Sequence, residues 1–296
     1  NEGSITTYGF KAHGILAQSI GGGGGNGGSS YSGDLAFGSD TAPASGKVGI
    51  FSIGGFGGDG NRSADVTVVN SGSIEVFGEK ANGIYAQSVG GGGGDGGFAM
   101  SLSRNSLKNP KTDLAASLMT FAMGGFGGSG ADSGNVTVDH TGSIISHGNK
   151  SYGIFAQSVG GGGGNGAHSI SSPVWTAADL ALSTVLGGGS SGTAGVVKIN
   201  TTGSITMLGE NSTAQFGQSV NGGGGNIDLF LDVSKQAVAI GDDGIELPDN
   251  GGDVDKVKAF VKSNIKLGTD TITGAVGSAI EVTHVGDLYT AGKNAR

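Results

Sequence analysis

The segment GIYAQSVGGGGGDGG, residues 83–97, decides the fold, because nearly the same sequence occurs three times in the chain. The other two copies are GILAQSIGGGGGNGG at 14–28 and GIFAQSVGGGGGNGA at 153–167. A fourth copy at 214–228, AQFGQSVNGGGGNID, has drifted but keeps Gln-Ser-Val and most of the glycines. Self-similarity of this kind indicates a repeat architecture in which each unit stacks on its neighbours.

The similarity extends upstream of the glycine run without insertions. A Gly-Ser-Ile lies at one fixed distance before each recurring glutamine, and a triplet such as Val136-Thr137-Val138 lies at a fixed distance before that. A partial fifth copy starts at Ile280, and the spacing between blocks varies only through the segments that separate them. The chain 1–296 is therefore predicted to be a single solenoid fragment. Its repeat blocks lie near 3–25, 66–94, 136–164, 197–225 and 280–292, and its variable spacers are 26–65, 95–135, 165–196 and 226–279.

Composition excludes several classes of protein. Glycine contributes 65 of 296 residues, but collagen needs glycine at every third position with abundant proline, and only 4 prolines are present. Sparse charge and clustered apolar residues disfavour disorder. The net charge of −8 and the lack of a Lys/Arg cluster predict no binding to nucleic acid or anionic lipid. No apolar run is long enough for a membrane-spanning helix, and the start NEGSITTYGF does not resemble a signal peptide. The absence of cysteine excludes disulfides and thiolate chemistry.

Within a block, three short runs rich in β-branched residues and bounded by glycine or asparagine predict three strands. We expect the block at 66–94 to form one coil and the spacer that follows it to form a second. Stacked coils of this kind give an all-β fold, a parallel β-helix built from repeats of about 70 residues. Eight or nine coils at about 4.8 Å each would make a rod roughly 40 Å long.

Two segments have alternative interpretations. A single five-glycine run is typical of a flexible linker, but recurrence in register favours an ordered glycine arc shared by successive coils. Two spacers also carry a related signature, GGFGGDG at 54–60 and GGFGGSG at 124–130. The apolar residues of DVDKVKAFVKSNIKL recur at helical spacing, which predicts one short amphipathic helix near 253–267.

Motifs that carry chemistry are few. The Gly-x-Gly-x-x-Gly matches are not followed by a predicted helix, so nucleotide binding is not expected. The five histidines show no zinc-binding spacing and are expected at solvated corners. No cofactor is predicted, and calcium is the one metal that remains possible. GGFGGDGNR at 54–62 only partly matches a calcium-binding nonapeptide, whereas the acidic loop at 241–255 supplies hard oxygen ligands. Its weak candidate ligands are Asp242, Asp243, Asp249 and Asp253.

No clustered carboxylates or positioned base are evident, so we predict no catalytic residues and no enzyme; a carbohydrate-active β-helix enzyme remains the alternative. The serines Ser19, Ser88 and Ser158 recur without a base beside them, which favours a packing role. Aromatic and glutamine positions also recur, and stacking would turn them into ladders either inside the rod or on its surface. The candidate contact ladders are Tyr85, Phe155 and Phe216, with Leu16 at the same position, and Gln18, Gln87, Gln157 and Gln218.

Taken together, the blocks G-S-I…G-I-x-A-Q-S-V-G-G-G-G-G and the GGFGG segments resemble the glycine-rich repeats in passenger regions of bacterial autotransporters of the type V secretion systems. The resemblance covers nearly the whole chain and is weak over 228–275. It implies a right-handed parallel β-helix exported to the surface of a Gram-negative bacterium and tethered at the outer membrane by a C-terminal translocator barrel.

The same resemblance implies a function in adhesion, autoaggregation or biofilm formation, or as a stalk. The partners it implies are a host or neighbouring-cell surface, a glycan or matrix, or a second copy of the chain. The alternatives are a β-helix enzyme that processes polysaccharides and a calcium-stabilised structural repeat. The resemblance carries no catalytic residues onto this sequence.

Overall fold

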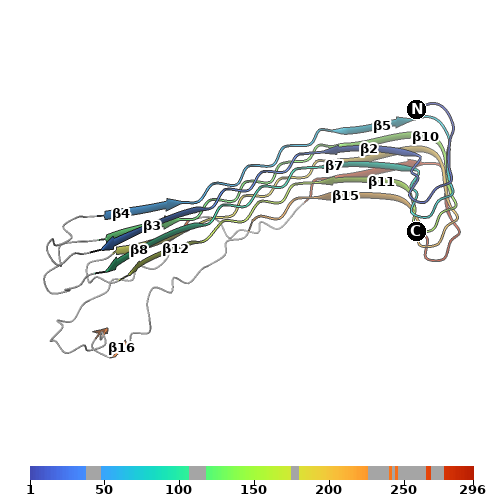
Figure 1. Ribbon diagram of the computed structural model, residues 1–296. Coiled ribbons are helices and arrows are strands. Elements are labelled where there is room, and N and C mark those ends of the chain that lie inside the picture. The colour runs from blue at the N-terminus through green and yellow to red at the C-terminus, as the bar shows by residue number, and fades with distance from the viewer. Residues whose placement is uncertain are drawn as a thin grey trace.

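The computed structural model describes residues 1–37, 48–106, 118–174, 180–225, 240–241, 244–245, 265–267 and 277–296. Every regular element in these residues is a β-strand, and no helix occurs among them. Four sheets are wholly parallel, and one short pair, β16 (Ile240–Gly241) and β17 (Gly244–Ile245), is antiparallel. The parallel strands stack into an elongated body whose two ends are joined by wavy backbone without strands (Figure 1).

One end of the body holds two sheets, which we call the long sheet and the ladder sheet. The long sheet contains β1 (Ile5–Thr7), β5 (Val66–Asn70), β6 (Ile74–Val76), β10 (Val136–Ser146), β14 (Val197–Met207), β19 (Ile280–Val285) and β20 (Leu288–Thr290). The ladder sheet contains β2 (Ile15–Ile20), β7 (Ile84–Val89), β11 (Tyr152–Val159) and β15 (Thr213–Val220).

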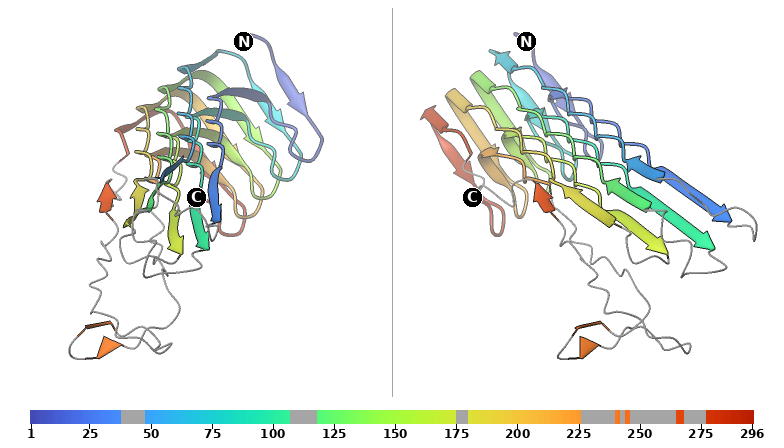
Figure 2. Two further views of the ribbon diagram at one scale, coloured as in Figure 1. Left: turned by 60° about the vertical axis from the view of Figure 1, so that its left-hand side comes forward. Right: turned by 90° about the vertical axis from the view of Figure 1, so that its left-hand side faces the viewer.

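The opposite end holds two further sheets, the far sheets. One contains β3 (Ser30–Phe37), β8 (Ala99–Ser106) and β12 (Ser169–Val174). The other contains β4 (Val48–Ile53), β9 (Leu118–Met123), β13 (Leu180–Leu186) and β18 (Ile265–Leu267). The chain runs out along β2 and β3, returns along β4 and β5, and turns into the next copy at β7 (Figure 2).

Each repeat therefore makes one coil. Gln18 pairs with Gln87, which pairs with Gln157, which pairs with Gln218, so neighbouring strands are one full repeat apart in sequence. This register corrects the expectation of two coils per repeat and of eight or nine coils. The block at 66–94 does not close on itself, because the chain continues from β7 through glycine to the far end and passes through β8 and β9 before it reaches β10, the strand that pairs with β5. The repeat spacing was correct, and the partial fifth copy joins the stack as β19, paired with β14.

An aliphatic core fills the space between the long sheet and the ladder sheet. Alternate residues of both sheets point inward, as the period of a strand requires, and Val136, Val138, Ile144 and Ile154 are fully buried. The equivalent residues of the neighbouring coils join them in one continuous cluster. Burial of each such side chain contributes about 1.5–3 kcal/mol, so the sequence pattern of β-branched residues stabilises this end of every coil.

Glycine triplets form the middle of each coil, which we call the waist. In the triplet Gly93-Gly94-Asp95, the first N–H donates to Gly162 O of the next coil at 2.8 Å, and the second donates across to Gly58 O at 2.9 Å. The third donates to Asn26 Oδ1 of the preceding coil at 2.9 Å. Every backbone donor of the triplet is thus satisfied without a sheet, and the three-residue period is that of a polyproline II helix.

The waist needs glycine because the opposing backbones touch directly. Hydrogen bonds cross the coil alternately, from Gly94 N to Gly58 O at 2.9 Å and from Gly128 N to Gly94 O at 2.7 Å. A Cβ added to Gly128 would lie 2.0 Å from Gly58 O, whereas one added to the outward-facing Gly92 would lie 3.6 Å from its nearest neighbour. The prediction of an ordered glycine arc is confirmed, since the runs stack in register and are held by hydrogen bonds.

Small residues predominate at the far end, where the buried side chains between the sheets are alanine, serine and threonine together with Ile50. Ser101 Oγ donates to Phe121 O at 2.7 Å, and Ser171 Oγ donates to Thr120 O at 2.9 Å. Ser101, Ser171 and Thr120 are fully buried. Short side chains that bond to the opposite backbone let the two far sheets approach closely. The interior therefore changes from aliphatic to backbone-only to small and polar along each coil.

Part of the predicted helix near 253–267 is replaced by a strand. Residues 265–267 form β18, which pairs with β13 through Thr184, Val185 and Leu186. The helix therefore does not extend to residue 267, because the edge of a parallel sheet offers these three residues backbone partners. Residues 253–264 lie outside the described residues.

Candidate functional site

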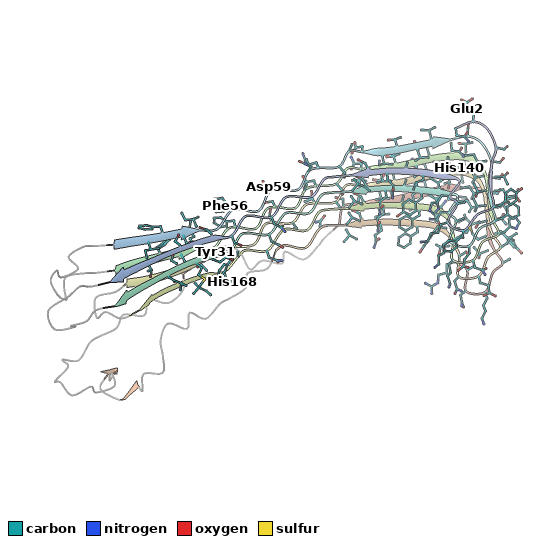
Figure 3. All side chains as sticks on the ribbon, in the orientation of Figure 1. Glu2, Tyr31, Phe56, Asp59, His140 and His168 are labelled. Carbon is teal, nitrogen blue, oxygen red and sulfur yellow. The ribbon has the colours of Figure 1, made fainter. Side chains whose placement is uncertain are left out.

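The outer face of the ladder sheet carries side chains that repeat from coil to coil. In β7 and β11 the isoleucine, alanine and serine positions are buried, and the alternate positions are half-buried on the outside. Both predicted ladders therefore lie on the surface and not inside the rod, because their positions alternate with the buried ones along each strand. Figure 3 shows side chains along the coils as sticks.

The aromatic ladder runs across four coils in register. Leu16 pairs with Tyr85, Tyr85 with Phe155, and Phe155 with Phe216. The rings of Tyr85 and Phe155 lie 4.8 Å apart and those of Phe155 and Phe216 lie 5.2 Å apart, nearly parallel in both pairs. Because the ring faces cover one another, the ladder presents ring edges to solvent.

The glutamine ladder lies two positions further along the same strands. Gln18 Nε2 donates to Gln87 Oε1 at 3.0 Å, Gln87 Nε2 donates to Gln157 Oε1 at 2.5 Å, and Gln157 Nε2 donates to Gln218 Oε1. Gln87 and Gln157 therefore each use one donor and one acceptor along the stack, whereas Gln18 only donates and Gln218 only accepts. Its remaining hydrogen-bonding capacity faces outward, where a ligand could use it.

The recurring serines point inward, as the packing interpretation predicts. Ser158 Oγ lies 2.7 Å from Ser133 Oγ, donates to Gly134 O at 2.8 Å, and accepts from Gly195 N at 2.8 Å. Ser158 is fully buried. The side chain thus joins the ladder sheet to the returning backbone of two successive coils, at Gly134 and at Gly195, and it does not face solvent.

A column of lysines at the corner before the ladder sheet was missed at the sequence level. Lys11, Lys80 and Lys150 occupy equivalent corner positions with φ of 55°, 57° and 55°, and Asn211 and Asn294 follow them with 53° and 57°. The signal was present in the sequence, because these lysines recur at the same spacing as the ladder glutamines. The net charge of −8 for the whole chain does not reveal this local column of positive charge.

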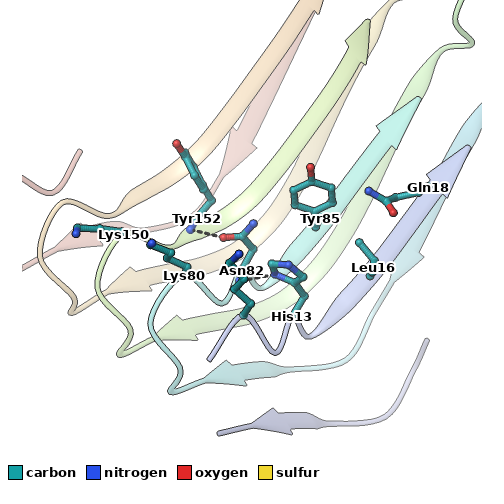
Figure 4. Close-up of a pocket in the computed structure, with 9 residues that line it drawn as sticks. His13, Leu16, Gln18, Lys80, Asn82, Tyr85, Lys150 and Tyr152 are labelled. Atoms are coloured by element: carbon teal, nitrogen blue, oxygen red, sulfur yellow. Dashed lines mark hydrogen bonds between the residues drawn. The ribbon is translucent and has the colours of Figure 1, made fainter. Parts of the chain in front are cut away.

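A groove of about 480 Å³ opens between the lysine column and the two ladders (Figure 4). It crosses three coils, and neighbouring coils contribute equivalent residues to it. Backbone and side chain are linked along its floor: Asn82 N donates to His13 Nδ1 at 3.0 Å, and Tyr152 N donates to Asn82 Oδ1 at 2.9 Å. Its lining residues are Lys11, His13, Leu16, Gln18, Lys80, Asn82, Tyr85, Lys150 and Tyr152.

Charge in the groove is predominantly positive. Lys150 Nζ lies 4.0 Å from Glu79 Oε1, while Lys11 and Lys80 form no ion pair within the described residues. Burial, with the charge of Lys11 as a second cause, lowers the pKa of His13. Burial also raises the pKa of Tyr85. His13 is therefore neutral at neutral pH and Tyr85 keeps its proton, so the lysines set the local charge.

The histidines are not all at solvated corners, which corrects that expectation. His140 is only 2% exposed, because it lies in the middle of β10 beside Asn70, whose Nδ2 is 2.7 Å from His140 Nδ1. His140 Nε2 is buried without a partner among the described residues, and burial lowers the pKa of this imidazole. Thr201 and His284 continue the same column, with Thr201 Oγ1 2.6 Å from His284 Nδ1. His147 lies near the surface, 3.0 Å from Glu75.

The predicted calcium ligands Asp242, Asp243, Asp249 and Asp253 lie outside the described residues. Within the part of the chain that the structure describes, no group of three or more histidine, aspartate or glutamate side chains could hold a metal ion. The same residues contain no helix with the length and apolar character needed to cross a membrane.

A scan against protein-family models finds no match, and searches of curated proteins and of solved structures find none either.

Proposed function

We propose that the chain is a surface-exposed rod, a right-handed parallel β-helix with one coil per repeat, that mediates adhesion, autoaggregation or biofilm formation. In this proposal it belongs to an autotransporter passenger tethered at the outer membrane of a Gram-negative bacterium. The observation that carries it is the pair of in-register ladders on the outer face of the ladder sheet. Half-buried aromatic and amide groups repeated along a rigid face form a contact surface on which many weak contacts add up.

The fold supports the same function. Within the described residues, each coil is bonded to its neighbours through strands at both ends and through glycine in the waist. A structure of this kind grows by adding coils, so its length can change without changing its cross-section. Such a rod suits a surface protein that holds contact groups, or a further domain, away from the cell.

The test is attachment and aggregation of bacteria that display this segment on an unrelated anchor, compared with an inert parallel β-helix of equal length. We expect attachment above that control. We also expect it to fall in the variant Tyr85→Leu/Phe155→Leu/Phe216→Leu, because leucine already occupies this position in the first coil as Leu16. Attachment equal to the inert control would contradict the adhesive function and leave the rod as a stalk.

A further inference from the structure

The groove beside the ladders combines three features that together specify a ligand. It crosses three coils, so equivalent groups recur along it at the coil spacing of about 4.8 Å. A ligand that uses several of them must itself be extended and repetitive. A polymer meets that requirement and a compact small molecule does not.

The first feature is a column of positive charge in a chain whose net charge is −8. Lys11, Lys80 and Lys150 are themselves the corner residues, with φ between 55° and 57°. Their backbone conformation is therefore the same in each coil, and it fixes where each side chain starts. Among the described residues, the carboxylate of Glu79 is the only one that lies within 4.0 Å of an ammonium group of the column, and that group belongs to Lys150. The column can therefore accept regularly spaced anionic groups.

The second feature is the way the aromatic rings are arranged. His13 stacks on Tyr85 with centroids 5.2 Å apart, and Phe155 covers the other face of Tyr85 at 4.8 Å. Because both ring faces are occupied, a nucleobase cannot insert between the rings. At Tyr85 the groove instead meets the edge of the ring, which carries the positive part of the ring quadrupole and favours anions.

The third feature is a set of unused polar groups. Asn82 uses its Oδ1 to accept from Tyr152 N, while its amide nitrogen forms no hydrogen bond within the described residues. Tyr85 donates to Gln87 Oε1 at 3.3 Å, which leaves the hydroxyl oxygen free to accept. Amide donors and hydroxyl acceptors suit a ligand rich in hydroxyl groups.

We propose that this groove binds a linear polysaccharide that carries carboxylate or sulfate groups. The lysine column pairs with the anionic groups, and Asn82, Gln18 and Tyr85 form hydrogen bonds with sugar hydroxyls. The proposal rests on the proposed surface function, because it names the ligand class that the contact face would meet outside the cell. The same chemistry occurs in sulfated and in uronate polysaccharides, and the test separates them.

The test measures binding of the purified chain to immobilised dextran sulfate and immobilised alginate, with neutral dextran as the uncharged polymer. We expect binding to at least one charged polysaccharide, weakening as NaCl rises from about 50 to about 200 mM, and none to dextran. The ratio of the two affinities shows whether sulfate or carboxylate is preferred. Failure to bind either charged polymer, or equal binding to dextran, would overturn the proposal.

Repeat-derived variants keep the fold while removing the charge. Lys80→Asn/Lys150→Asn installs the residue that Asn211 supplies at the same corner, and should weaken binding about tenfold, equivalent to about 1.4 kcal/mol. The control Arg62→Thr/Lys198→Thr removes two positive charges elsewhere, and its replacements match Thr193, two coils from Arg62, and Thr137 in the coil next to Lys198. We expect the control to stay within about twofold. Equal weakening in both variants would contradict the groove.

A second comparison separates sugar recognition from simple charge. Tyr85→Phe removes one hydroxyl at a position that is phenylalanine in the next two coils. It should weaken polysaccharide binding about threefold and leave binding of polyglutamate unchanged. Tighter binding of polyglutamate or of single-stranded DNA than of any polysaccharide would overturn the assignment of ligand class. Cells that attach while the purified chain binds no polysaccharide would refute this proposal and leave the adhesive function standing.

Discussion

In each coil the end that holds the long sheet and the ladder sheet, which we call the block end, and the waist stack in the same register but by different means. At the block end, Ile144 and Ile154 fill an aliphatic core between two sheets, whereas in the waist Gly94 and Gly128 bond directly across the coil with no side chain between them. A core of side chains can adjust to a change in volume, but opposed backbones cannot. Identical stacking can therefore conceal very different tolerance to substitution.

The largest expected effect is in the waist. Gly128→Ala places a Cβ 2.0 Å from Gly58 O, and the carbonyl cannot move without breaking bonds to neighbouring coils. We expect a loss of more than about 4 kcal/mol in the free energy of unfolding, measured by urea denaturation. The matched control is Gly92→Ala, which faces solvent and should change stability by less than about 1 kcal/mol. Equal losses in the two variants would show that the waist is not packed as described.

The core of the block end should be less sensitive. Ile154→Ala removes a fully buried side chain and should cost about 3 kcal/mol, because neighbouring side chains relax only in part around the cavity. Phe155→Leu, the next position along the strand and on the outer face, should cost much less. Urea denaturation measures both losses. An equal loss of stability in Phe155→Leu and Ile154→Ala would show that the inner and outer faces of the ladder sheet are not as described.

Acid should destabilise the block end through His140. Burial holds the pKa of His140 below its unfolded value of about 6.5, so the unfolded chain binds the proton more readily. Stability is then full above that pH and falls as pH drops toward the folded pKa, by at most about 1.4 kcal/mol per pH unit. The free energy of unfolding, measured by urea denaturation between about pH 7.5 and 5, should change less steeply with pH in the variant His140→Asn. This variant copies the aligned Asn70. An unchanged slope would mean that His140 is not the group responsible.

The smallest effect is expected on the outer ladder. Gln157→Ala breaks the hydrogen bonds to Gln87 and Gln218 at partly exposed positions, so it should cost about 0.5–1 kcal/mol. Surface attachment should decline more than this loss of stability explains. Full attachment by this variant would show that the glutamine ladder is not part of the contact surface.

The sequence predicted the strands, the register between repeats and the ordered glycine runs, because the repeats align without gaps and each aligned pair becomes a neighbouring pair. It did not predict one coil per repeat. The partners of Gly94 N and Gly128 N lie on the opposite side of the coil, and nothing local to the triplets shows this. The outward direction of Tyr85 and Gln87 could have been predicted from their alternation with Ile84 and Ala86 in β7.

The lysine column could also have been predicted, because Lys80 and Lys150 share the repeat spacing. The groove itself could not, since its depth depends on how His13 packs on Tyr85 and how Tyr152 packs against Phe155. The burial of His140 likewise depends on tertiary structure, because the short strand signal around it does not show which face is covered.

The most direct test of one coil per repeat with an ordered waist is disulfide formation, which is unambiguous in a chain without cysteine. Gly92→Cys/Gly162→Cys joins outward positions of adjacent coils, about 4.8 Å apart and within the range of a disulfide. Gly23→Cys/Gly162→Cys joins positions two coils apart, at about twice that distance. We predict rapid intramolecular oxidation of the first pair and none of the second. Similar rates for both pairs, or no bond in either, would contradict the account.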